Sequence, residues 1–151
     1  MTDSVQSVQN RRAESQHLIN ELVTHRSKML TCFNELLTHR PFTGGSATIE
    51  LLNRFCDLMI DYTADAHFRL YRYIEEGRER RRAVIAVADQ VYDDIVTTTD
   101  QIVNFNDRYG GDGATVRFEK LEADISALGE VLADRIEHED QLIAVFQQGR
   151  S

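Results

Sequence analysis

The sequence is poor in residues that interrupt helices or cross-link chains. Proline occurs once, at Pro41, and both cysteines, Cys32 and Cys56, lie inside segments with a helical apolar period. Thiols in such positions are typical of reduced core residues, so a disulfide-stapled fold is excluded. No run of about 18 uncharged apolar residues occurs, and residues 1–15 lack the apolar stretch of a signal peptide. We therefore expect a soluble, cytoplasmic protein.

Basic side chains are scarce in the part of the chain where acidic ones are dense. The 151 residues include 25 acidic and 17 basic side chains, which gives a net charge of −8. Residues 83–140 hold 14 acids and 4 bases, so the remainder is slightly positive. An acidic surface repels nucleic-acid phosphates, which disfavours direct DNA binding. It attracts a basic protein surface instead, such as one that normally contacts DNA.

Glycines divide the chain into four long segments of helical period. The segments cover about residues 12–39, 47–76, 79–108 and 114–147, and most of the eight glycines lie between them. Helices of such similar length with short connections pair as antiparallel neighbours. The predicted fold is therefore all-α, an antiparallel up-down four-helix bundle. It forms a single domain over residues 1–151, with residues 1–11 frayed.

Each segment carries an apolar seam with three- and four-residue spacing. The seams of the first and second segments consist of Leu18, Leu22, Met29, Phe33 and Leu36, and of Ile49, Leu52, Phe55, Cys56, Met59, Tyr62, Ala66, Leu70 and Tyr73. Those of the third and fourth consist of Val84, Val87, Val91, Ile95, Thr98, Ile102 and Phe105, and of Leu121, Ile125, Leu128, Leu132, Leu142 and Phe146. These residues are the predicted core.

Two charged residues, Arg135 and Glu139, occupy seam positions of the fourth segment. Charges at a seam are rare unless they are paired, and the four-residue spacing allows these two to pair. Asp61 or His67 of the second segment could complete a network with them. Such a network either sets the register of the helices or forms the floor of a polar groove used by a partner. The sequence leaves both interpretations open.

Catalytic and metal-binding patterns are incomplete. A di-iron bundle needs a Glu from two helices and Glu-x-x-His from the other two, and the chain has one such motif, Glu14 to His17. Cys56 and His67 are about 16 Å apart along one helix, too far for a nucleophile and its base. The glycine-rich residues 109–114 lack the lysine of a phosphate-binding loop. We therefore expect no catalytic activity, no metal and no cofactor.

Three segments together resemble one family. Residues 55–71 (FCDLMIDYTADAHFRLY) are similar to the F-C-x-x-L-x-D-Y-x-S-A-G-H-F-x-x-Y segment of the Rsd/AlgQ family. Residues 104–108 (NFNDR) and 132–143 (LADRIEHEDQLI) resemble two further segments in the same order. The first helix departs from the family, with Asn20, Glu21 and Leu22 in place of Asp-Arg-Trp, although Arg26 matches the arginine that follows.

The resemblance implies a regulator that binds the C-terminal, promoter-reading region of the primary sigma factor of RNA polymerase and sequesters it. A region that reads promoter DNA is basic, in agreement with the charge argument. The candidate partner-binding or polar-groove residues are Arg26, Asp61, His67, Arg135, Glu139 and Asp140. The alternatives are a di-iron type helical-bundle enzyme and a scaffold for a phosphotransferase carrier protein, to which some relatives are linked.

Overall fold

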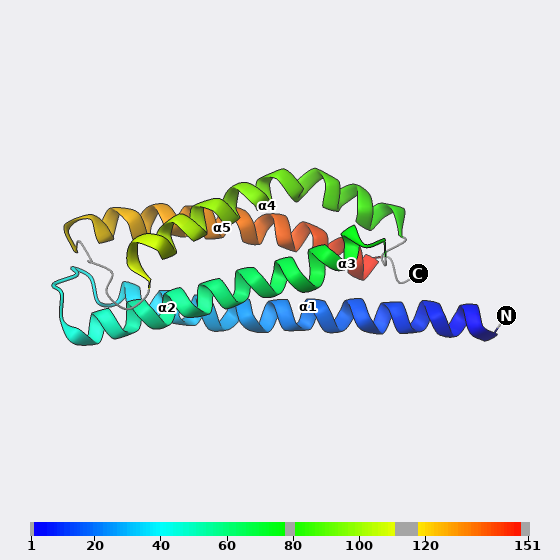
Figure 1. Cartoon of the computed structure of the whole chain (residues 1–151), viewed down its shortest axis with the longest axis horizontal. Coiled ribbons are helices and arrows are strands. Elements are labelled where there is room, and N and C mark those ends of the chain that lie inside the picture. Colours follow the sequence, from blue (N-terminus) through cyan, green and yellow to red (C-terminus); the bar gives the residue numbers. More distant parts are fainter. Residues whose placement is uncertain (1, 78–80, 111–117, 149–151) are drawn as a thin grey trace.

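The computed structural model describes residues 2–77, 81–110 and 118–148, and no residue of these ranges is in a strand. The helices are α1 (Thr2–Leu37), α2 (Ser46–Asp65), η1 (Ala66–Tyr71), α3 (Arg72–Glu75), α4 (Arg82–Tyr109) and α5 (Phe118–Gln148). α2, η1 and α3 follow one another without a break and form a single rod. The four rods lie side by side and alternate in direction, which confirms the predicted all-α four-helix bundle (Figure 1).

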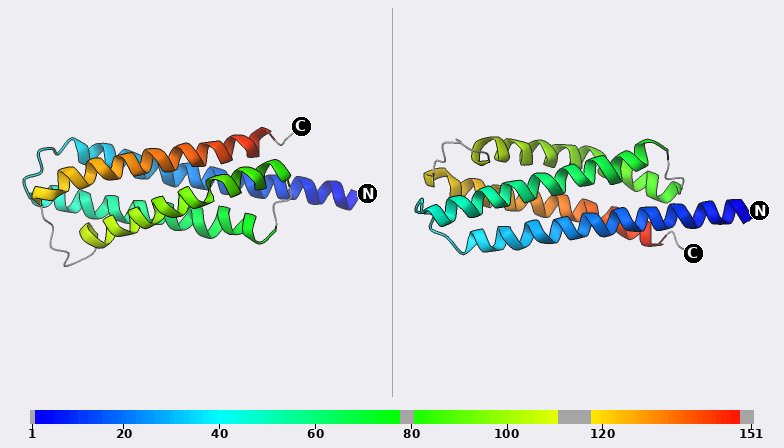
Figure 2. Two further views of the ribbon diagram at one scale, coloured as in Figure 1. Left: turned by 90° about the horizontal axis from the view of Figure 1, so that it is seen from above. Right: turned by 60° about the horizontal axis from the view of Figure 1, so that its bottom comes forward.

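The rods are arranged in the cyclic order α1, α2, α4, α5, so that α1 lies diagonally opposite α4 (Figures 1 and 2). α1 begins at Thr2, earlier than the expected start at residue 12, and its first turns extend past the neighbouring helices (Figure 1). The fraying expected for residues 1–11 stays a prediction. None of the described helices combines the length and apolar character that crossing a membrane requires.

Glycines mark the ends of the helices where the chain needs a left-handed backbone. Gly77 has a φ of 75°, and its N–H donates to the Ile74 carbonyl oxygen at 3.1 Å, which closes the last turn of α3. Gly44, with a φ of 86°, lies in the α1–α2 connection. Both positions suit glycine because a Cβ disfavours positive φ. The glycine punctuation read from the sequence therefore places these helix ends correctly.

The core is built mainly from the predicted seams. Phe33, Phe55, Phe105 and Tyr109 form a row of aromatic rings across α1, α2 and α4, with successive ring centroids 5.3, 6.3 and 4.7 Å apart. Three seam predictions are corrected: Leu18, Ile49 and Val87 are half-buried, whereas their chain neighbours Ile19, Thr48 and Ala88 are buried. In each case the buried neighbour continues the strict alternation of three- and four-residue spacings (Ile19–Leu22, Thr48–Leu52–Phe55 and Val84–Ala88–Val91), whereas the predicted residue breaks it.

The π-helical segment η1 is a feature that the apolar period does not reveal. It interrupts the predicted second helix between residues 66 and 71. Within it, two consecutive residues, Leu70 and Tyr71, are buried, with exposed fractions of 1% and 4%. π-helical turns are often found at functional sites. Here η1 brings the hydroxyl of Tyr71 into the interior.

Candidate functional site

Arg135 and Glu139 of α5 are both buried, each with 1% of its surface exposed. The Arg135 Nε donates to Glu139 Oε2 at 3.3 Å and to the Tyr62 hydroxyl oxygen at 3.2 Å. The Tyr62 hydroxyl in turn donates to Glu139 Oε1, and the Arg135 guanidinium carbon lies 5.4 Å from the centre of the Tyr62 ring. The charge pair of α5 is therefore joined to α2 through one tyrosine.

The other end of the Arg135 guanidinium is held by α4. Its Nη1 donates to the hydroxyl oxygens of Thr99 and Thr98 at 2.8 and 3.2 Å and lies 3.4 Å from the Ile95 carbonyl oxygen. The two threonine hydroxyls donate back to the same carbonyl oxygen at 2.9 and 2.8 Å. Thr98 and Thr99, which have a low helix propensity, thus supply hydrogen-bond acceptors to the buried Arg135 guanidinium.

The network reaches the surface between α1 and α5. Arg26 of α1 donates to Asp140 Oδ1 at 2.9 Å, and its Nη1 lies 3.6 Å from Glu139 Oε1. The Arg26 side chain is 15% exposed and that of Asp140 is 56% exposed. Two guanidinium groups and two carboxylates, those of Arg135, Arg26, Glu139 and Asp140, therefore form a continuous series from the centre of the bundle to the solvent. We call Arg26, Tyr62, Thr98, Thr99, Arg135, Glu139 and Asp140 the charge network.

Burial sets the protonation of the groups at the centre of this network. It raises the pKa of the Glu139 carboxyl, and the Arg135 and Arg26 guanidiniums and the Tyr62 hydroxyl oppose that rise. Burial and the Glu139 carboxylate both raise the pKa of Tyr62. Burial also raises the pKa of Tyr71, whose buried hydroxyl has no hydrogen-bond partner among the described residues. Both tyrosines therefore stay protonated at an alkaline pH at which a tyrosine of the unfolded chain ionises.

The structure corrects the expected membership of the network. Asp61 and His67 are exposed, and the α2 residue that bonds to Arg135 and Glu139 is Tyr62. Tyr62, the neighbour of Asp61, takes that place because consecutive residues of a helix point about 100° apart. Sequence reasoning placed Tyr62 in the apolar seam without assigning its hydroxyl a partner. A buried tyrosine usually bonds through its hydroxyl, and that rule would have indicated the link to Glu139.

Asp61 instead lines an open groove between α2 and α4. The groove is formed by Asp57, Ile60 and Asp61 of α2 and by Asn106, Asp107 and Gly110 at the end of α4. Three of these six residues are carboxylates, and none is a lysine or arginine. We call this feature the acidic groove. No described lysine or arginine pairs with these three carboxylates, so the groove suits a cationic side chain of a partner.

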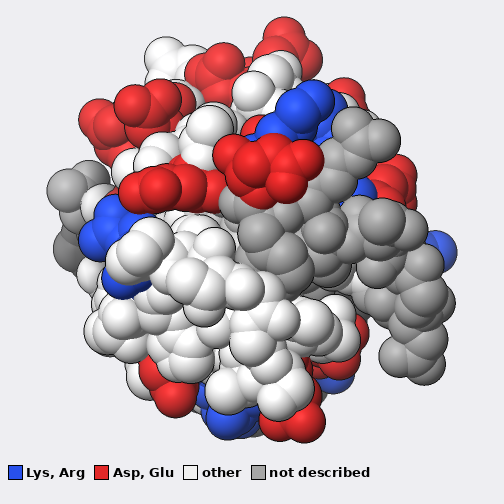
Figure 3. All heavy atoms as spheres, turned by 90° about the vertical axis from the view of Figure 1, so that its left-hand side faces the viewer, with Lys and Arg blue, Asp and Glu red and all other residues white. Residues whose placement is uncertain are grey.

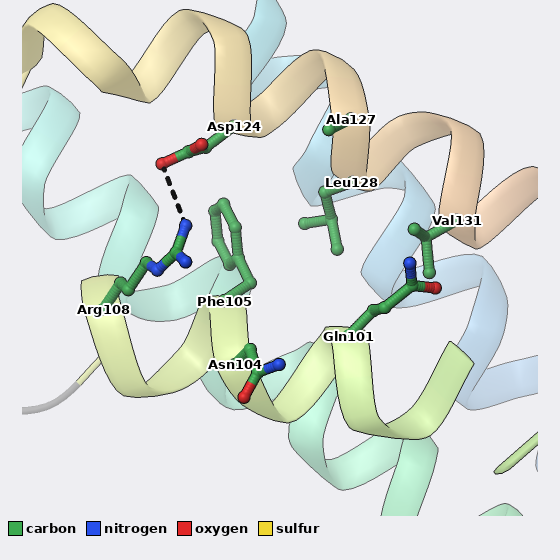
Figure 4. Close-up of a pocket in the computed structure, with 8 residues that line it drawn as sticks. All are labelled: Gln101, Asn104, Phe105, Arg108, Asp124, Ala127, Leu128 and Val131. Carbon is green, nitrogen blue, oxygen red and sulfur yellow. Dashed lines mark ion pairs between the residues drawn. The ribbon is translucent and has the colours of Figure 1, made fainter. Parts of the chain in front are cut away.

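The NFNDR segment divides its side chains between two faces of α4. Asn106 and Asp107 line the acidic groove, whereas Asn104, Phe105 and Arg108 line a second depression, between α4 and α5 (Figure 4). There Phe105 lies between Leu128 and an ion pair of 3.7 Å that joins Arg108 and Asp124 (Figure 4). Asp124 also accepts a hydrogen bond from the Tyr109 hydroxyl. These bonds fasten the end of α4 to the start of α5.

The surface charge follows the sequence pattern. Asp89, Asp93, Asp94, Asp100 and Asp107 are all exposed on α4, and no lysine or arginine occurs between residues 82 and 108. At the end of the bundle where α4 finishes and α5 begins, acidic side chains gather on the side of these two helices (Figure 3). The half formed by α1 and α2 is mostly uncharged in that view. At this end of the bundle, the acidic side chains therefore lie mainly on the side of α4 and α5.

The donor atoms that meet do not match the di-iron pattern. In the described part of the chain, the group close enough to share an ion is Glu21, His25 and Asp65, whose atoms lie within 4.8 Å of one another. The Arg69 guanidinium already pairs with Glu21 at 3.3 Å and with Asp65 at 2.7 Å. One histidine and two carboxylates around an arginine do not provide the ligands of two iron ions. The geometry therefore gives the di-iron alternative no support.

Comparison with known proteins gives a consistent result. The model of a family described as "Regulator of RNA polymerase sigma(70) subunit, Rsd/AlgQ" matches residues 1–147. A protein named "Regulator of sigma D" from Yersinia enterocolitica is 28% identical over 150 residues, 95% of this chain and 88% of that protein. Its namesake from Pectobacterium atrosepticum is 25% identical over 149 residues, 95% of this chain and 96% of that protein. No solved structure matches.

Proposed function

The chain belongs to the Rsd/AlgQ family of regulators of the RNA polymerase sigma(70) subunit, and from this premise we propose that it binds the C-terminal, promoter-reading region of the primary sigma factor and sequesters it. It acts in the cytoplasm by one-to-one binding, as a single domain without catalytic residues or a cofactor. The observation that carries the proposal is the family match together with the acidic groove at Asp61, a residue of the segment that resembles the family.

Charge complementarity supports this partner. A sigma region that reads promoter DNA presents basic side chains, because DNA contacts require neutralisation of phosphates. The acidic groove and the exposed aspartates of α4 offer carboxylates to the same side chains. A sigma factor held in this way cannot bind promoter DNA with the same surface. Competition for one basic surface is therefore the mechanism of sequestration.

The candidate residues divide into two roles in this proposal. Asp61 and His67 are exposed and contact the partner directly, and Asp140 and Arg26 lie where the charge network meets solvent. Arg135 and Glu139 are too deeply buried to touch a partner. They hold α2, α4 and α5 in register, which keeps the two sides of the acidic groove at a fixed separation.

Purified protein mixed with the full-length primary sigma factor of the native host is expected to form a one-to-one complex. Size-exclusion chromatography with light scattering measures the complex, and added promoter DNA is expected to compete with it. Absence of a complex would contradict the proposal. A pull-down from lysate that captures a phosphotransferase carrier protein and no sigma factor would support the scaffold alternative instead.

Replacing Asp61 by asparagine is expected to weaken sigma binding about tenfold, because a hydrogen bond to a charged group contributes roughly 1.5–3 kcal/mol. Fluorescence anisotropy or calorimetry would measure the dissociation constant. Glu35→Gln is the matched control, since Glu35 is an exposed carboxylate of α1 beside the opposite side of α2. Equal affinity of wild type and Asp61→Asn would exclude the acidic groove from the interface.

The association rate with the sigma factor is expected to fall steeply as salt rises. The Debye length shortens from about 10 Å at 0.1 M to about 3 Å at 1 M, so long-range attraction by the α4 aspartates fades across that range. Stopped-flow measurements at several salt concentrations would follow the rate. A rate independent of salt would show that electrostatic steering by this surface is unimportant.

A further inference from the structure

α4 carries an apolar stripe on its exposed surface. Tyr92, Val96 and Val103 are the exposed large hydrophobic side chains of the described residues, with exposed fractions of 42%, 41% and 41%. All three belong to one helix, and their spacings of four and seven residues place them on one line along it. Three apolar side chains aligned in this way differ from the scattered exposed hydrophobics of ordinary surfaces.

The stripe leads into the acidic groove. Continuing from Val103 by four and seven residues gives Asp107 and Gly110, and both line the groove beside Asp57 and Asp61 of α2. The stripe therefore runs along the side of α4 that faces α2. From residue 92 to residue 107 it extends about 22 Å, at 1.5 Å per residue, which matches an α-helix of about four turns.

Acidic side chains accompany the stripe. Asp93 and Asp100 lie three residues before and four residues after Val96, one helical turn away in each direction, and Asp89 lies one turn further. The surface is thus apolar along its centre and negative along one side and at one end. An amphipathic helix with an apolar line and flanking lysines or arginines has the complementary pattern.

We propose that the stripe of Tyr92, Val96 and Val103, together with the acidic groove, receives one basic amphipathic helix of the sigma factor, an inference that rests on the proposed function. The apolar side chains of that helix cover the stripe, and its cations pair with the aspartates of α4 and with Asp61. The apolar contacts supply most of the affinity, and the aspartates accelerate association and orient the helix.

The charge of this surface argues against other occupants. A second copy docked through the same stripe would bring like-charged aspartates together, which is unfavourable in a symmetric interface. Nucleic acid and anionic lipid surfaces carry the same sign of charge and are repelled. A basic helix is the occupant that satisfies both the apolar and the acidic parts.

The double variant Val96→Ser/Val103→Ser is expected to raise the dissociation constant for the full-length primary sigma factor at least tenfold. Its salt dependence should stay that of the wild type, because the aspartates remain. Asp93→Asn/Asp100→Asn should instead slow association several-fold at 0.1 M salt and have little effect at 1 M. Biolayer interferometry would measure both rates. Thermal unfolding followed by circular dichroism would verify that each variant is folded.

Leu30→Ser is the matched control, because Leu30 is a half-buried apolar residue of α1, diagonally opposite α4. It is expected to lose some stability and to bind the sigma factor normally.

If wild type binds and Val96→Ser/Val103→Ser binds equally well, the docking surface is wrong and the proposed function stands. If wild type does not bind the sigma factor, the proposed function itself fails. A dimer that the double variant disperses, with sigma binding intact, would assign the stripe to a second copy and overturn the proposal.

Discussion

Arg135→Ala is expected to lower the free energy of unfolding by about 3–5 kcal/mol, because removing one partner of a buried ion pair leaves the other buried charge poorly compensated. Glu139 would lose the Arg135 Nε donor and keep the Tyr62 hydroxyl and the more distant Arg26. For a chain of this size the midpoint of thermal unfolding should fall on the order of 10 °C. Urea unfolding followed by circular dichroism would measure the change.

A double substitution separates two contributions to the free energy of unfolding: the cost of leaving one charge of the Arg135–Glu139 pair unpaired, and the net stabilisation by the intact pair. Arg135→Met/Glu139→Leu gives an apolar seam of similar volume and should recover part of the lost stability, the remainder being the cost of the buried Tyr62 hydroxyl, which loses both of its partners. Thr98 and Thr99 stay satisfied, because their hydroxyls also donate to the Ile95 carbonyl oxygen. Unchanged stability of Arg135→Ala would show that the pair is solvated in solution. A stable double variant that no longer binds the sigma factor would show that the network shapes the interface as well as the register.

The protein is expected to lose stability steeply above about pH 10, by roughly 2.7 kcal/mol per pH unit from Tyr62 and Tyr71 alone. Both have a pKa raised by burial, so they stay protonated in the folded state while the unfolded chain releases their protons. A raised folded-state pKa means that the stabilisation is complete below the unfolded pKa near 10 and is lost as the pH rises beyond it. Tyrosinate absorbance at increasing pH would detect these groups titrating only as the chain unfolds.

Tyr71→Phe provides the control for the alkaline transition. The Tyr71 hydroxyl has no hydrogen-bond partner among the described residues, so its removal should cost little or stabilise slightly. Above about pH 10 the free energy of unfolding of the variant should also fall less steeply with pH, by the contribution of one ionising group. A slope equal to that of the wild type would mean that Tyr71 titrates in the folded state, and its hydroxyl would then be hydrated.

The sequence alone was sufficient for most of the fold because its signals are local. Seam residues such as Ile95 and Leu128 are buried as predicted, and Gly77 ends a helix where the punctuation placed a break. Helix period and glycine conformation depend on neighbours a few residues away, and every such signal is visible in a linear chain. The seam predictions failed at Leu18, Ile49 and Val87, where the buried neighbour is the residue that continues the strict alternation of three- and four-residue spacings.

The charge network was predictable only in part. The pairing of Arg135 with Glu139 follows from their spacing on one helix, but the groups that complete it come from three other helices. Asp61 was the wrong choice and Tyr62 the right one, although they are adjacent. Their side chains point about 100° apart around the axis of α2. Which of the two faces the core depends on how α2 packs against its neighbours, and the spacing of residues along the sequence does not reveal it.

Composition, period and the three family-like segments thus determined that the chain is an acidic, all-α bundle of the Rsd/AlgQ type. Tertiary structure decided which carboxylates are buried and which are exposed, and it brought Asp57, Asp61 and Asp107 together from two helices. It also placed the stripe of Tyr92, Val96 and Val103 outside the core. The physical reason is that burial depends on how the helices pack against one another. Each helix packs with its most apolar arc towards the core, and this orientation sets the exposure of its other side chains.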